Sequence, residues 1–204
     1  MHQLYTIGHS NLDWETFLSA LRQLEIALVG DVRSRPLSSR FPHFSQTEIE
    51  FGLREAGMRY IFLGEELGGR PEDRKVYRSD GLVDYRACRR SRGFQSGIER
   101  VQRELDASAL ALMCAEEDPL DCHRFLMICP ELVILGLDPA HIRRGATLET
   151  QREAEDRLLG QQQLSAALGP SLFPVDRAQV LEDAYLAQAE KCAFRLDPQT
   201  AEIW

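Results

Sequence analysis

The sequence lacks any apolar run close to the roughly 18–20 residues that a membrane-spanning helix needs. Its N-terminus also lacks the charged and then apolar pattern of a signal peptide. Cysteines are few and odd in number, five in 204 residues, and they are scattered between Cys88 and Cys192, which is not the pattern of a disulfide framework. We therefore expect a cytoplasmic protein with reduced thiols and no membrane partner.

Lysine is nearly absent, with only Lys75 and Lys191, so arginine carries almost all of the positive charge. The net charge is −8, yet residues 33–103 hold 15 of the 24 basic side chains and only 10 of the 32 acidic ones. This asymmetry predicts either a surface that attracts a small anionic ligand or nucleic acid, or simply a solvated arginine-rich face.

Two nucleotide-binding signatures are also missing. The sequence has neither the glycine-rich dinucleotide fingerprint nor the phosphate-binding loop with its lysine. Redox chemistry with a dinucleotide is therefore not indicated, and we expect no cofactor. If the protein is an enzyme, hydrolytic or transfer chemistry fits better.

The first part of the chain alternates strand and helix patterns. This alternation predicts a three-layer α/β domain over residues 1–147, a parallel sheet with helices on both faces. The polar, Gln- and Glu-rich sequence that follows predicts a helical C-terminal extension over 148–204, packed on the domain or forming a homodimer contact. The expected strands are Leu4–Ile7, Ile26–Val32, Arg59–Leu63, Ala109–Met113 and Ala140–Arg143. The expected helices are Asp13–Leu24, Gln46–Ala56, Tyr85–Leu105 with interruptions near Gly93 and Gly97, His123–Leu135 with a kink at Pro130, Leu148–Leu168 and Arg177–Glu190, and residues 70–83 are expected to be an exposed loop.

Five motifs follow the predicted strands in order: GHSN, DVRSRPLSSRFPHF, YIFLGEELGG, LMCAEEDPLDCHR and HIRRG. In combination, over roughly residues 4–145, they resemble the domain-of-unknown-function family 488. The resemblance implies a three-layer α/β domain with a shared site at the strand ends. It implies no reaction.

The loop after the fourth predicted strand has the highest density of reactive side chains. If Asp121 caps the next helix, Cys122 lies at the first helical position, where the helix dipole favours a nucleophilic thiolate, with His123 and Arg124 adding positive charge. The acidic neighbours oppose this, and a structural thiol is the alternative. Glu116 is the candidate for acid–base chemistry or for binding ribose hydroxyls, or it only balances the helix dipole.

Cys114 ends the fourth predicted strand, where packing is its simplest role. With Cys122 and His123 it supplies soft metal ligands, to be completed by Glu116, His9 or His43. The spacing is not that of a zinc knuckle or ribbon, so we assign no metal from the sequence.

Three further loops carry candidates for substrate binding. Asp31 and Arg33 share one strand face and, with Arg40, predict either a buried ion pair or an anion site in which Asp31 orients the arginines. The other candidates are His9, as acid or base, and Ser10 after the first strand, and Gly68 with Gly69, which allow close backbone approach to a ligand.

In a parallel sheet these loops meet at one edge. The sequence therefore predicts an enzyme acting on a nucleotide, nucleobase or nucleic-acid-derived substrate, with Glu116, Cys122 and His9 catalytic. Substrate binding is assigned to Ser10, Asp31, Arg33, Arg40, Gly68, Gly69, His123 and Arg124. The alternatives are a non-catalytic nucleotide- or nucleic-acid-binding module and a thiol-redox or metal-binding protein.

Overall fold

A six-stranded sheet forms the centre of the protein, in the strand order β3-β2-β4-β1-β5-β6. The computed structural model describes residues 2–165 and 175–197. All neighbouring strands are parallel except β5 and β6, which are antiparallel. The strands are β1 (Leu4–Gly8), β2 (Leu28–Asp31), β3 (Arg59–Phe62), β4 (Leu110–Cys114), β5 (Ala140–Ile142) and β6 (Leu148–Thr150).

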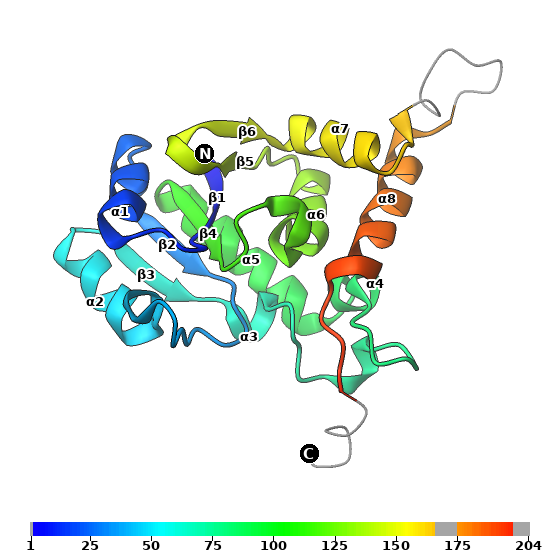
Figure 1. Ribbon diagram of the computed structural model, residues 1–204, viewed down its shortest axis with the longest axis horizontal. Coiled ribbons are helices and arrows are strands. Elements are labelled where there is room, and N and C mark those ends of the chain that lie inside the picture. The colour runs from blue at the N-terminus through cyan, green and yellow to red at the C-terminus, as the bar shows by residue number, and fades with distance from the viewer. Residues whose placement is uncertain (1, 166–174, 198–204) are drawn as a thin grey trace.

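Helices cover both faces of this sheet (Figure 1). Alternate strand residues point to opposite faces, so Val29 and Met113 join one apolar cluster while Leu28 and Leu112 join the other. The first cluster contains α1 and α2, and the second contains α5 and α6. The predicted three-layer α/β class is thus confirmed. The helices are α1 (Trp14–Gln23), α2 (Gln46–Glu55), α3 (Gly64–Leu67), α4 (Tyr85–Arg89), α5 (Arg92–Ala107), α6 (Cys129–Ile134), α7 (Gln151–Gln161) and α8 (Arg177–Cys192).

Two predicted helices differ from the structure in a way that local chemistry explains. The helix expected over Tyr85–Leu105 is divided into α4 and α5 by Ser91, whose side chain caps α5 by accepting from the Phe94 amide; the break does not lie at either glycine. The helix expected from His123 is a π-helix over Arg124–Ile128 that continues as α6. The wider turn accommodates Pro130, which has no amide hydrogen to donate.

The chain after residue 147 begins with a strand. Leu148–Thr150 was expected to start a helix but pairs as β6 with β5, and Thr150 then caps α7 in a capping box with Glu153. Residues 166–168, the end of that expected helix, lie outside the described residues. The predicted helix over Arg177–Glu190 is confirmed as α8.

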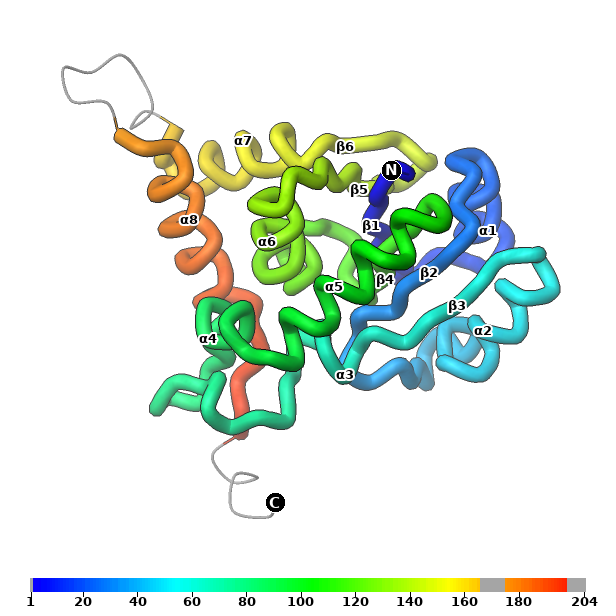
Figure 2. The backbone as a smooth tube through the Cα atoms, turned by 180° about the vertical axis from the view of Figure 1, so that it is seen from behind, coloured from blue at the N-terminus to red at the C-terminus, as the bar shows by residue number. Residues whose placement is uncertain are grey.

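The last described residues return to the body of the domain. Helix α8 lies on the side of the molecule away from α1 and α2 and leads back towards α4 (Figure 2). Beyond it, Leu82 pairs with Arg195, and the Val83 amide donates to the Phe194 carbonyl. The stretch 70–83, expected to be an exposed loop, is therefore partly structural, and Val76, Leu82 and Val83 are buried. Among the described residues, no helix has the length and apolarity to cross a membrane.

Candidate functional site

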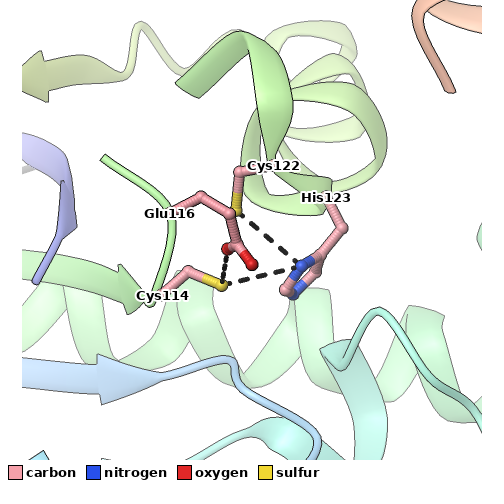
Figure 3. Close-up of side chains that lie close together, drawn as sticks. All are labelled: Cys114, Glu116, Cys122 and His123. Carbon is pink, nitrogen blue, oxygen red and sulfur yellow. Dashed lines mark hydrogen bonds between the residues drawn. The ribbon is translucent and has the colours of Figure 1, made fainter. Parts of the chain in front are cut away.

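Four reactive side chains converge at the carboxyl end of β4 (Figure 3). Cys114 is the last residue of β4, Glu116 follows in the loop, and Cys122 and His123 lie just before the π-helix. The ligand atoms of all four lie within 4.8 Å of one another. We call Cys114, Glu116, Cys122 and His123 the thiol–imidazole cluster.

The imidazole of His123 faces both sulfur atoms. Its Nδ1 lies 3.7 Å from Cys114 Sγ and 3.8 Å from Cys122 Sγ. Its Nε2 lies 2.9 Å from the carbonyl oxygen of Val32, which only accepts hydrogen bonds, so Nε2 carries a proton and donates. This bond fixes the ring with Nδ1 directed at the two thiols.

The backbone of the cluster loop is held from both sides. The His9 and Ser10 amides donate to the carbonyls of Cys114 and Ala115, at 2.9 and 2.8 Å. Gly8 makes this close approach possible, because a Cβ atom there would lie 1.7 Å from the carbonyl oxygen of Glu116. The loop is therefore positioned before any ligand binds.

Arg124 supplies a buried positive charge beneath the cluster. It is 1% exposed, and its guanidinium donates to the carbonyls of Glu116 and Glu117 at 2.7 and 2.9 Å. Among the described residues no carboxylate lies within 4 Å of this guanidinium, and its Nε has no hydrogen-bond partner. Burial opposes its charge, and Cys122, Cys114 and Glu116 of the cluster favour it and raise the pKa of Arg124 overall.

The pKa values of the two cysteines in the cluster are shifted in opposite directions. Burial, and then the adjoining Cys122, raise the pKa of Cys114 well above its usual value. Burial acts in the same direction on Cys122, but the facing Cys114 thiol and the charges of Arg124 and His123 outweigh it and lower the Cys122 pKa. Of the two sulfurs, Cys122 is therefore the one more readily deprotonated.

The pKa values of Glu116 and His123 are both raised. Burial is the main cause that raises the pKa of Glu116, and the Cys122 charge adds to it. Burial opposes protonation of His123, but Cys122, Glu116 and the Val32 carbonyl raise its pKa overall. Cys114 Sγ donates to Glu116 Oε2 at 2.9 Å.

A pocket of about 670 Å³ opens onto this cluster. Cys114, Glu116 and His123 line it, whereas Cys122 lies behind them. The loops after β1, β2 and β4 all contribute to the wall, as the sequence predicted. The remaining lining residues are His9, Arg33, Ser34, Arg35, Leu37, Ser38, Gly69, Arg70, Tyr85, Ala115, Asp121 and Cys192–Arg195.

Asp31 and Arg33 form a buried ion pair beside the pocket. Arg33 donates from Nε and Nη2 to the two carboxylate oxygens of Asp31, and Nη2 also donates to the Phe44 carbonyl. Its Nη1 donates to His9 Nε2, and His9 Nδ1 faces the Ser10 carbonyl. Burial, and then the Arg33 charge, lower the pKa of His9 to about 4, so this ring is neutral with both nitrogens engaged.

Other predicted residues occupy different positions. Arg40 lies over the Phe41 ring and does not line the pocket, and Ser10 lines a separate pocket beside α1. Gly69 contacts the His123 ring, while Gly68 packs on Ser34.

The predicted helix cap before Cys122 is wrong. Cys122 is extended ahead of the helix, and its amide donates to the Pro119 carbonyl. The Asp121 carboxylate accepts from Gln188 on α8 rather than capping the π-helix. Cys122 therefore does not lie at the first position of a helix. The charges of Arg124 and His123 act on its thiol without the helix dipole that the sequence suggested.

Several pocket residues were not predicted, among them Arg35, Arg70, Phe194 and Arg195. Arg35 follows the predicted Arg33 by two positions and shares its motif, so the signal was present in the sequence. Arg70 is placed at the pocket by its amide, which donates to Ser34 Oγ, and its guanidinium lies over the Phe194 ring. Phe194 and Arg195 reach the pocket because the end of the chain pairs with residues 81–83. No local pattern indicates that pairing.

These features define an α/β protein with a preformed pocket at the carboxyl ends of its strands, a thiol–imidazole cluster inside it and arginines around it. The chain matches the family model described as Domain of unknown function DUF488 over residues 13–128, more than half its length, and it belongs to that family. The match includes the whole cluster. Comparison with curated proteins and with solved structures found no match.

Proposed function

We propose that this protein is an enzyme that acts on a small anionic substrate of the nucleotide type by hydrolysis or group transfer. The observation that carries the proposal is the pocket itself, which places a thiol–imidazole cluster below exposed arginines. Perturbed titratable groups gathered in a preformed cleft are the usual mark of a functional site.

The arginines at the pocket are suited to a phosphate group. Arg35 is exposed and has no ion-pair partner among the described residues, while Arg70 is held over the Phe194 ring with its guanidinium 4.7 Å from the ring centre. Arg195 also lines the pocket but is paired with Asp80 at 2.9 Å, so Arg35 and Arg70 are the arginines that we assign to the ligand. Guanidinium groups bind phosphate oxygens through two parallel hydrogen bonds, so this set supports an anionic ligand.

Aromatic surface in the same pocket supports a base or nucleoside. Phe194 lines it and is partly exposed, whereas Tyr85, also in the wall, is buried. Bases stack readily on aromatic side chains, so Phe194 is the candidate for this contact. The volume of about 670 Å³ is within the range of small-molecule sites.

Glu116 is the residue we assign to proton transfer. It faces the pocket, and its raised pKa brings it closer to the values useful for acid–base catalysis. Cys122 lies behind the pocket wall and His9 has both nitrogens engaged, so they are placed to support the site rather than to touch a substrate.

Nucleic-acid binding without catalysis is the competing function. It would need the arginines of residues 33–103 to form a free basic surface, but many are paired with acidic side chains. Arg59 pairs with Glu104, Arg100 with Glu66, and Arg86 and Arg89 with Glu182 of α8. Because these arginines are paired, they do not form a free basic surface, and this favours a small ligand over a nucleic acid.

The test is to incubate the reduced protein with a defined panel of nucleotides, nucleosides and nucleobases and to follow each compound by mass spectrometry. Binding is measured separately by calorimetry. We expect Arg35→Gln to weaken binding of a phosphate-bearing compound by about tenfold, the effect of one charged hydrogen bond. Glu116→Gln should abolish conversion and retain binding.

Arg40→Gln is the matched control, because it removes an exposed arginine of the same loop that does not line the pocket. It should bind like the unchanged protein. Failure of every compound to bind, or equal losses in both arginine variants, would overturn the proposal. Binding without conversion of any compound would support the non-catalytic module.

A further inference from the structure

We propose that the thiol–imidazole cluster is a binding site for one zinc ion, with Cys114, Cys122 and His123 as ligands and Glu116 at the position that faces the pocket. The inference deepens the proposed function, since the ion would lie at the floor of the same pocket. It rests on separate contacts from those that bind the anion.

The donor set matches zinc chemistry. Zinc in proteins is bound by thiolate, imidazole and carboxylate in tetrahedral geometry, and its ligand bond lengths place neighbouring ligand atoms about 3.4–3.8 Å apart. The distances from His123 Nδ1 to Cys114 Sγ and Cys122 Sγ are 3.7 and 3.8 Å. The Cys114 Sγ–Glu116 Oε2 distance, 2.9 Å, needs only a small outward movement of a side chain that is open to the pocket.

The orientation of His123 is that of a metal ligand. Metal-binding histidines almost always donate their second ring N–H to a carboxylate or backbone carbonyl, which fixes the tautomer. His123 donates from Nε2 to the Val32 carbonyl at 2.9 Å, and this leaves the Nδ1 lone pair for the ion. The Gly69 backbone packs against the ring and holds it there.

Charge balance also favours a cation. A bound metal requires both cysteines to be deprotonated, so two thiolates and one carboxylate would then carry three negative charges, opposite the one positive charge of buried Arg124. A divalent ion brings the sum to zero, whereas buried charge without a partner is costly.

The loop is already in position to bind. The backbone of Cys114, Ala115 and Glu116 is held by the His9 and Ser10 amides and by Arg124. The pocket provides the path of entry, because Cys114, Glu116 and His123 line it. Three protein ligands with a replaceable group towards a cavity is the arrangement of catalytic rather than purely structural zinc. An ion there would activate water for the hydrolytic chemistry proposed above.

The experiment uses the full chain, reduced, stripped with a chelator and then titrated with Zn²⁺ alone. We expect about one bound zinc per chain by elemental analysis. Cobalt substitution should give a thiolate charge-transfer band and the visible bands of a tetrahedral site. Zinc should also protect two thiols from a thiol reagent.

Cys114→Ser and Cys122→Ser should each weaken zinc binding by at least about 100-fold. Cys192→Ser is the matched control, because this thiol lines the pocket but donates to the Gln188 carbonyl and lies outside the cluster. Glu116→Gln, a change at a side chain open to the pocket, provides a second variant should loss of a buried thiol impair folding. It should retain the cobalt–thiolate band with altered visible bands.

Absence of stoichiometric zinc in the reduced wild-type chain would overturn the proposal, as would equal binding by Cys122→Ser and Cys192→Ser. Arg35→Gln should weaken anion binding and leave metal binding unchanged. Failure of the zinc site with intact nucleotide binding therefore leaves the proposed function standing, and the reverse result leaves the zinc site standing.

Discussion

Gly69 lies against the imidazole of His123, so closely that a Cβ atom on Gly69 would be 2.9 Å from both Cγ and Nδ1 of the ring. A displacement of the ring would disturb the hydrogen bond from its Nε2 to the Val32 carbonyl. The approach of these two residues couples the loop after α3 to the geometry of the cluster.

Gly69→Ala should therefore displace the ring and weaken zinc binding by about 10–100-fold, the usual effect of disturbing the support of a ligand. The measurement is competition with a chelator. Gly93→Ala is the control, because nothing lies within 4 Å of a Cβ there. It should leave zinc binding unchanged and stabilise α5 by about 0.5–1 kcal/mol. Equal zinc affinities in the two variants would contradict the coupling.

Arg124→Met should lower the free energy of unfolding by about 3–5 kcal/mol, since it removes the buried charge that balances the cluster and leaves two carbonyls without donors. Denaturant unfolding with linear extrapolation measures this change. Arg152→Met, at an exposed helix pair with Asp156, should cost less than about 0.5 kcal/mol. Similar losses of unfolding free energy in the two variants would show that Arg124 does not stabilise the cluster more than an exposed arginine stabilises the surface.

The layers of the fold were predictable because they depend on the alternation of strand and helix patterns along the chain. Ile7, Val29 and Met113 lie in short apolar runs that each end in polar residues, and these runs became neighbouring strands. Strand β6 could not be predicted in the same way. Two of its three residues, Glu149 and Thr150, are polar, and the segment pairs with β5.

The site was predicted where it depends on strand ends and missed where it depends on long-range contacts. Cys114, Glu116, Cys122 and His123 all come from one loop, so a dense motif indicated them. Their mutual distances depend on a 3-10 turn over Pro119–Asp121 and on Arg124, which spacing alone does not reveal.

Asp118 ties the cluster loop to the C-terminal extension. Its carboxylate accepts from both Arg157 Nη atoms at 2.9 Å, from Arg143 at 3.1 Å and from the Leu120 amide at 3.0 Å. Asp118→Asn should lower the free energy of unfolding by about 1–3 kcal/mol, because charged hydrogen bonds are lost. Asp156→Asn, which removes more exposed ion pairs, should change it by less than about 1 kcal/mol. Thermal and denaturant unfolding of both variants tests the difference, and equal losses would show that the Asp118 pairs contribute no more than surface pairs.

His141 predicts a pH dependence of stability. It is buried between Thr6 and Gln151, at 2.8 and 3.1 Å, and burial, with the charge of Arg124, lowers its pKa to about 3. The unfolded chain takes up a proton near pH 6.5, whereas the folded protein does not until about pH 3. Stability must therefore fall as the pH decreases below 6.5, at up to about 1.4 kcal/mol per pH unit from this residue alone.

Denaturant unfolding at several values between about pH 7 and pH 5 measures that slope, in a range where most carboxylates remain ionised. His141→Gln retains a polar side chain but cannot titrate. The slope of its unfolding free energy against pH should therefore be shallower by about 1.4 kcal/mol per pH unit, even though its stability at pH 7 is lower. His9, whose pKa is about 4, contributes with the same sign to both proteins and does not affect the difference. Parallel curves for the two proteins would mean that His141 takes up its proton in the folded state as readily as in the unfolded chain.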